Sequence, residues 1–102
     1  MALRVAWSPE AVEDIESIAA YIERDSIYYA RAVVGKIVET GKSLSQFPES
    51  GRIVPEIDDP AIRERFVYSY RVIYRVETDR LLIVAVVHGR RLLGAVEGRF
   101  EY

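Results

Sequence analysis

The sequence predicts an α+β fold in the order β-α-α-β-β-β, an antiparallel sheet with an N-terminal helical hairpin packed on one face. Two long stretches with apolar residues at helical spacing lie between one short alternating stretch and three strand-like stretches. At 102 residues the chain has the length of one domain with a two-layer core. We therefore expect a single domain over residues 1–102, with residues 92–102 as a C-terminal tail.

The first strand and first helix are predicted at the N-terminus. "LRVAW" alternates in the way of a half-buried strand. "SPEAVEDIESIAAYIER" then places Ser8 at the N-cap and Pro9 at the first helical position, with acids in the first turns, where the helix dipole favours them. This pattern predicts a helix from Pro9 to Arg24.

A second helix is predicted in "DSIYYARAVVGKIVETGKSLSQFP", starting at Asp25 or Ser26 and ending before Pro48. Gly41 lies on its apolar face and is expected to let the neighbouring helix approach closely. Because the connection is short, the two helices should form an antiparallel hairpin.

Residues 48–60, "PESGRIVPEIDDP", are expected to form a loop because they hold three prolines, a glycine and several acids. Strands are expected at "IRERFVY", "YRVIYRV" and "LLIVAVVH", the first two joined near Ser69. The last of these is apolar on both faces, which predicts a central position in the sheet.

The composition excludes several kinds of site and segment. With no cysteine and a single histidine, we expect no disulfide, no metal site and no cofactor. The N-terminal residues have no apolar core typical of a signal peptide, and no apolar run reaches the roughly 20 residues that span a bilayer. We therefore expect a cytoplasmic protein without a membrane partner.

The charges are unevenly distributed. The net charge is −2, but residues 62–91 carry seven arginines against three acids. The planar fork of arginine suits bidentate pairing with carboxylate or phosphate. The low overall charge weighs against nucleic acid, since nonspecific affinity for nucleic acid comes from many basic groups.

Four of these arginines are candidates for a partner-binding surface. Alternation places Arg63 and Arg65 on one face of their strand, and Arg71 and Arg75 on one face of the next. If the two faces coincide, four guanidinium groups crowd one side of the sheet, which suggests a partner of negative charge. The alternative is surface charge paired with neighbouring acids, namely Glu64, Glu77 and Asp79.

The stretch "VAVVHGRR" holds the one histidine, His88, at the end of the last strand. Two interpretations are open: His88 is a catalytic base, or it caps the strand by bonding backbone or a carboxylate while Gly89 lets the chain turn. We favour the cap, with Arg90 and Arg91 aimed at a partner.

The ordered set "SPEAVEDIESIAAYI", "FPESGRIVPE", "IRERFVYSYRVIYRVE" and "LLIVAVVHGRR" resembles the RelE/ParE superfamily of bacterial toxins from type II toxin–antitoxin, or plasmid stabilisation, systems. The resemblance covers about residues 3–91. It implies a small toxin that is neutralised by a cognate antitoxin encoded beside it, with a homodimer or a toxin–antitoxin heterotetramer as possible assemblies.

The superfamily has two branches, and the resemblance implies a different target for each. RelE-like members are ribosome-dependent mRNA endonucleases, for which Arg71, Glu56, His88 and Arg65 would be the catalytic candidates here. ParE-like members poison DNA gyrase without known catalysis. No lysine follows Lys42 and no tyrosine directly follows His88, so we expect the ParE-like branch and favour no catalytic residue.

The predicted partner-binding residues follow from this interpretation, with gyrase as the expected target and the ribosome with its mRNA as the alternative. A third possibility is an inactive member that only binds antitoxin. The tail is apolar, so it should fold back on the sheet or belong to an interface, and in ParE-like toxins this region contributes to gyrase poisoning. The predicted set is Arg63, Arg65, Arg71, Arg75, Arg90, Arg91, Leu92 and Leu93.

Overall fold

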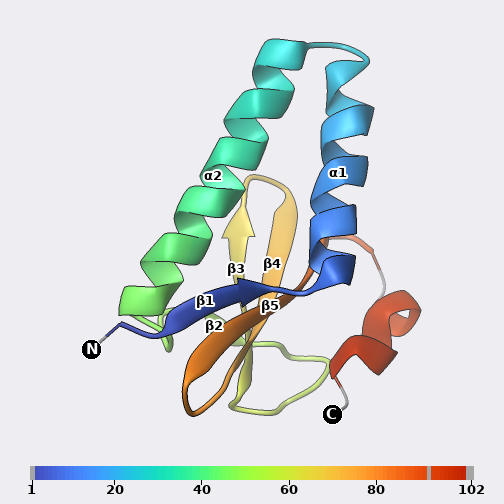
Figure 1. Cartoon of the computed structure of the whole chain (residues 1–102). Coiled ribbons are helices and arrows are strands. Elements are labelled where there is room, and N and C mark those ends of the chain that lie inside the picture. The colour runs from blue at the N-terminus through green and yellow to red at the C-terminus, as the bar shows by residue number, and fades with distance from the viewer. Residues whose placement is uncertain (1, 92, 101–102) are drawn as a thin grey trace.

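The computed structural model describes residues 2–91 and 93–100. A helical hairpin stands against one face of a five-stranded sheet (Figure 1), whose strand order is β1-β5-β4-β3-β2. The sheet is mixed, because β1 runs parallel to β5 while every other pair is antiparallel. The elements in chain order are β1 (Arg4–Trp7), α1 (Pro9–Glu23), α2 (Ile27–Gln46), β2 (Arg52–Ile53), β3 (Ile62–Val67), β4 (Tyr70–Val76), β5 (Arg80–His88) and the 3₁₀ helix η1 (Leu93–Phe100).

Both helices begin where the sequence predicts. The Oγ of Ser8 accepts a hydrogen bond from the backbone N–H of Ala11 at 3.1 Å, and the Oγ of Ser26 accepts one from Tyr29 at 3.0 Å. Each serine thereby satisfies a backbone N–H that the helix cannot pair internally. The predicted helices are confirmed, with boundaries within one or two residues. No helix in the described part of the chain combines the length and the apolar character needed to cross a membrane.

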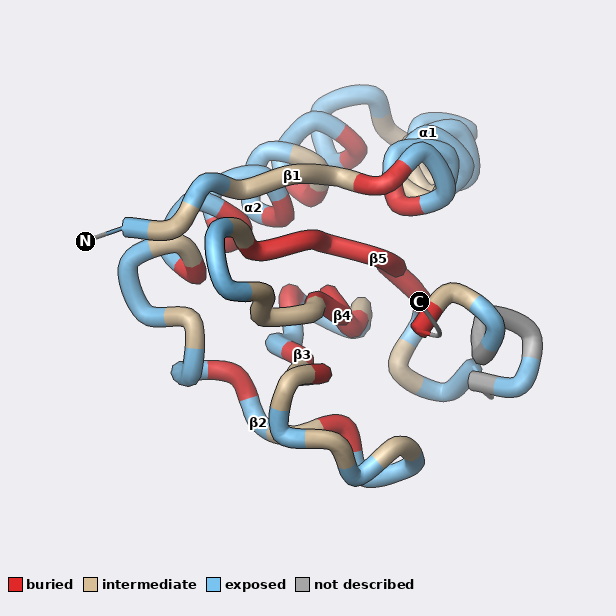
Figure 2. Tube along the Cα trace, turned by 60° about the horizontal axis from the view of Figure 1, so that its bottom comes forward, coloured by how far each residue is buried: buried red, intermediate tan, exposed pale blue. Residues whose placement is uncertain are grey.

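The sheet separates two apolar clusters. β5 lies between β1 and β4, and every residue from Leu81 to Val87 is buried (Figure 2), which confirms its predicted central position. The helix-side cluster includes Ala11, Val33, Ile37, Leu44, Val72, Tyr74, Leu81, Ile83 and Val86. The opposite cluster is formed by Val54, Ile62, Ile73, Leu82, Val84, Ala85, Val87 and Phe100.

Three features differ from the prediction. Residues 52–53 pair with β3 as strand β2 inside the expected loop, and β1 joins the antiparallel meander in parallel. Gly41 does not face the neighbouring helix: a Cβ atom there would lie 2.8 Å from the Trp7 ring and 3.1 Å from Ile83 Cδ1. The absent side chain makes room for β1 and β5 beneath α2.

The tail folds back beside the sheet on the side away from the helices, as Figure 1 shows for η1. Phe100 is buried in the second cluster, and its carbonyl oxygen accepts a hydrogen bond from Arg75. Arg99 donates to the carboxylate of Asp14 at 2.7 Å, and this carboxylate also accepts from the backbone N–H of Val86. Of the two predictions for the tail, folding back on the sheet is therefore observed for its last described residues.

Candidate functional site

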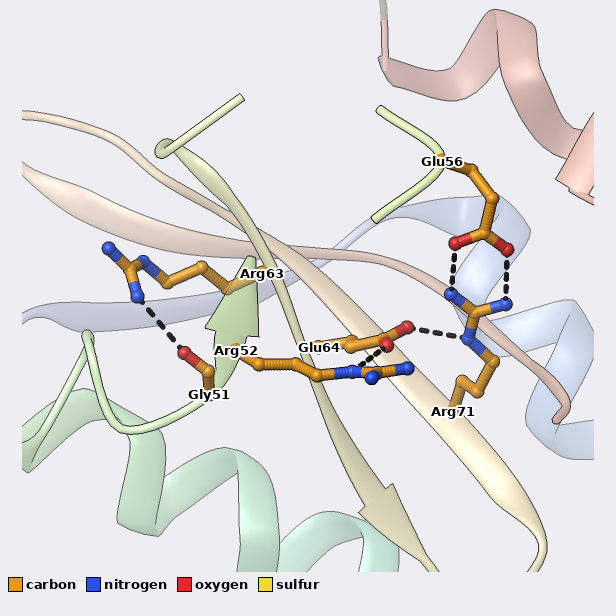
Figure 3. A network of polar contacts seen from close by, with 6 residues as sticks. All are labelled: Gly51, Arg52, Glu56, Arg63, Glu64 and Arg71. Atoms are coloured by element: carbon orange, nitrogen blue, oxygen red, sulfur yellow. Dashed lines mark hydrogen bonds and ion pairs between the residues drawn. The ribbon is translucent and has the colours of Figure 1, made fainter. Parts of the chain in front are cut away.

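An ionic network lies on the sheet face opposite the helices (Figure 3). At its centre is Arg71 on β4, whose side chain is only 4% exposed. Its Nη1 and Nη2 donate to the two carboxylate oxygens of Glu56 at 2.8 and 2.9 Å, and its Nε donates to Glu64 at 2.5 Å. A bidentate arginine–carboxylate pair is among the strong side-chain contacts in proteins.

The strand register creates this network. Arg52 of β2 lies directly opposite Glu64 of β3, and Phe66 lies opposite Arg71 of β4, so Glu64 and Arg71 are diagonal neighbours on one face. The Glu64 side chain is 0% exposed, and its second oxygen accepts from Arg52 Nε at 2.6 Å. A buried carboxylate is tolerated when charged partners surround it in this way.

The network shifts the pKa values of its members. The hydrogen bonds from Arg71 lower the pKa of Glu56 from 4.5 to about 2, against the opposing effect of burial. The bond to Glu56, aided by that to Glu64, raises the pKa of Arg71 above its ordinary value. Both groups are therefore charged at neutral pH, and two carboxylates balance the two guanidinium groups of Arg52 and Arg71.

Arg63 and Arg65 lie on the opposite, helix-facing side of the sheet from Arg71 and Arg75. The register pairs Arg63 with Tyr74 and Arg65 with Val72, whereas Arg71 and Arg75 share the other face with Glu64. Residues opposite one another in neighbouring strands point to the same side of a sheet. The two pairs of arginines therefore lie on different faces, and the four guanidinium groups do not form one cluster. Membership of a partner-binding surface stays a prediction for each arginine.

The two helix-side arginines help to hold the loop before β2. Arg63 donates to the carbonyl oxygen of Gly51 at 3.1 Å, and Arg65 donates to Ser50 Oγ at 3.2 Å. The buried Tyr74 hydroxyl donates to the carbonyl oxygen of Pro48 and accepts from the Gly51 N–H, and burial raises the pKa of this phenol. These contacts anchor the segment that carries Arg52 into the network.

His88 is separated from Glu56 and Arg71 by the sheet. It pairs with Tyr70, which packs on the helix-side cluster, and the two rings meet edge to face at 5.8 Å. With Tyr21 of α1 it lines a surface groove of about 370 Å³. His88 Nδ1 accepts from the backbone N–H of Arg90 at 3.2 Å, which is the backbone contact expected of a strand cap.

The four catalytic candidates of the nuclease alternative thus lie on two different faces of the sheet. Arg71 and Glu56 meet on one face, while His88 and Arg65 belong to the other. Arg90 and Arg91 are exposed after β5. Leu92 lies outside the described residues, and Leu93 opens η1.

Sequence reasoning missed the central role of Glu64, which it treated as a surface acid. The available signal was alternation, because Glu64 stands between Ile62 and Phe66 on the same side of its strand. It also missed the pair of Asp14 and Arg99, for which a separation of 85 residues leaves no local signal. No cluster of metal-binding side chains occurs among the described residues.

The fold and site define a small α+β protein whose main polar cluster is a closed, charge-balanced network. A family model described as the ParE toxin of the type II toxin–antitoxin system, parDE, matches residues 5–93. The chain therefore belongs to this family, the ParE toxins of type II toxin–antitoxin systems.

Individual relatives agree with this membership. A toxin candidate of Sinorhizobium fredii, Y4kP, is 37% identical over 49 residues, which are 48% of this chain and about half, 51%, of that protein. A chromosomal ParDE system from P. aeruginosa superposes with a TM-score of 0.70 at 22% identity, over 85% of this chain and 96% of the other.

Two further solved structures share the fold. The RelBE2 toxin–antitoxin complex from Mycobacterium tuberculosis matches with a TM-score of 0.62 at 18% identity, over 86% of this chain and 99% of the other. The YoeB dimer from Staphylococcus aureus matches with a TM-score of 0.60 at 20% identity, over 86% and 98%. Since a ParDE, a RelBE2 and a YoeB structure all share this fold, the fold alone does not identify a target.

Proposed function

We propose that this toxin poisons DNA gyrase in the cytoplasm through protein contact, without a catalytic step of its own. The observation that supports this most is the separation of His88 from Arg71 and Glu56 by the sheet. Cleavage of RNA at a ribose 2′-hydroxyl needs a base, a cation for the developing phosphate charge and an acid within reach of one bond.

The charge state of Arg71 supports the same proposal. All three of its nitrogens donate to carboxylates, so its positive charge is already balanced by Glu56 and Glu64. A phosphate would have to displace Glu56 from a bidentate pair before it could bind there. We infer that Arg71 ties the loop after β2 to the sheet.

We also propose that a cognate antitoxin covers the helical hairpin. The ends of α1 and α2 that meet at the hairpin turn expose several large side chains, which are Tyr21, Ile27, Tyr28 and Tyr29. An antitoxin segment that folds on binding could bury them while its acidic residues pair with Arg65, Arg90 or Arg91. The P. aeruginosa and M. tuberculosis structures named above are toxin–antitoxin systems.

The test is made with the purified chain, in one reaction with gyrase, ATP and closed circular DNA, and in another with ribosomes translating an mRNA. We expect cleaved DNA trapped on gyrase and intact mRNA. The variants His88→Gln and Glu56→Gln should act on gyrase as the wild type does. Cleaved mRNA that disappears with either variant would contradict the proposal and favour the nuclease.

A further inference from the structure

An exposed group of aromatic and arginine side chains lies at and beside the turn between β3 and β4, and Arg52 is its one member that also belongs to the ionic network. Phe66 is 51% and Tyr68 60% exposed, although both are large and partly apolar. The Arg52 guanidinium lies over the Phe66 ring, 5.7 Å from its centroid. Arg90 is exposed next to Gly89, which packs against Phe66. We call Arg52, Phe66, Tyr68 and Arg90 the turn patch.

Two contacts hold the backbone of the turn and the side chain of Arg52 in place. The Gly89 N–H donates to the Ser69 carbonyl oxygen at 2.7 Å, which ties the end of β5 to the turn. A Cβ atom at Gly89 would lie 3.0 Å from the Phe66 ring and 3.2 Å from that same oxygen, so a side chain there would be tight against both. Arg52 is in turn fixed by Glu64. A surface ordered before binding loses less conformational entropy when a partner docks.

Tyr68 occupies an unfavourable backbone conformation. Its φ is 53°, in the left-handed region where tight hairpin turns favour glycine, asparagine or aspartate. A residue with a bulky side chain is destabilised there, and an exposed ring recovers little of that cost through packing. An observed strain of this kind is a reason to look for a function of the side chain.

The composition and charge of the turn patch indicate the kind of partner. Tyrosine, phenylalanine and arginine are enriched in protein interfaces, and tyrosine and arginine dominate binding hot spots. Arg90 is exposed and contributes positive charge, whereas the charge of Arg52 is balanced by its ion pair with Glu64. Aromatic and arginine side chains also suit single-stranded nucleic acid, but the net charge of −2 favours a protein.

We propose that the turn patch docks on an acidic surface of a folded protein partner, with Tyr68 as its anchor. The identity of this partner rests on the function proposed above, under which it is gyrase.

The experiment measures inhibition of purified gyrase by the wild-type chain and by Tyr68→Asn, Arg90→Ser and Tyr28→Asn. Tyr28 is a matched control, since it is 83% exposed on α2 and has a negative φ. We expect Tyr68→Asn to melt at a higher temperature, because asparagine tolerates the left-handed region. It should nevertheless need at least about tenfold more protein for the same inhibition. Arg90→Ser should also weaken inhibition, and Tyr28→Asn should not.

Three results would overturn the proposal. If the wild type inhibits gyrase and Tyr68→Asn inhibits equally well, the turn patch is not the docking surface, although the function stands. If the wild type does not inhibit gyrase at all, the proposed function is wrong, and gyrase is not the partner of the turn patch. If a single-stranded oligonucleotide binds the wild type and not Tyr68→Asn, the patch serves nucleic acid.

Discussion

At the scale of single residues, Glu64 has the least replaceable charge in the candidate site. It is buried between two arginines, and each of its oxygens accepts one of their hydrogen bonds. Removing one partner of a buried ion pair is costly because the remaining charge keeps its desolvation penalty. This residue therefore determines whether Arg52 and Arg71 can stay at the sheet.

Replacing Glu64 should destabilise the protein far more than replacing Glu56. We expect Glu64→Gln to lower the free energy of unfolding by about 3 kcal/mol. Glu56→Gln should lower it by less than about 1 kcal/mol, because Glu56 is 48% exposed and its pairing is screened by water. Urea denaturation at neutral pH measures both, and equal losses would contradict a buried centre at Glu64.

The stability that Glu56 contributes should depend on pH. Its pKa is about 2 in the folded protein against an ordinary 4.5, so the unfolded chain takes up the proton first as the pH falls. The contribution is complete above pH 4.5 and disappears as the pH falls from there toward 2. The difference in unfolding free energy between the wild type and Glu56→Gln should shrink over this range. A difference that stays constant down to pH 2 would refute the pairing.

Individual site residues were predictable only in part. The resemblance implies Arg71 and Glu56 as catalytic candidates of the nuclease alternative alone, and the structure brings the two side chains together. Their contact could not be predicted, because it depends on where the loop after β2 returns to the sheet. For Glu64 the strand pattern held the information, since a charge in phase with apolar neighbours must be buried with a partner or lie at an edge.

At the scale of elements, the loop between α2 and β3 is shaped by close contacts. β2 has only two residues, and its turn-forming sequence gives no periodicity from which a strand can be inferred. Its position is set by Gly51, where a Cβ atom would lie 2.4 Å from the Tyr74 hydroxyl oxygen and 2.6 Å from the Glu64 carbonyl oxygen. Strand β2 thus depends on the absence of one side chain.

Alanine substitutions at two glycines should have opposite effects. Gly51→Ala should lower the free energy of unfolding by about 2 kcal/mol, because the new methyl group meets backbone that cannot move freely. Gly35→Ala should raise it by about 1 kcal/mol, because alanine is the better helix former and a Cβ atom there meets nothing within 4 Å. Thermal unfolding of the two variants is the measurement. A Gly51→Ala protein as stable as the wild type would mean that β2 is not held by this contact.

At the scale of the whole molecule, the sheet separates the arginines of β3 from those of β4, because the two pairs lie on opposite faces. Helix caps, strand alternation and the apolar last strand predicted the fold, because these signals are local. The face on which each arginine lies was not predictable, because a shift of one residue in the register reverses the face of a whole strand. With the observed register, Arg65 and Arg71 lie on opposite faces.

The proposed target of this toxin is gyrase and not translated mRNA. The most direct measurement is pulse labelling of DNA and protein synthesis in the first minutes after the chain is induced in bacteria without an antitoxin. We predict that DNA synthesis falls first and that the SOS response follows. An earlier fall in protein synthesis, or no effect on either process, would contradict the proposal.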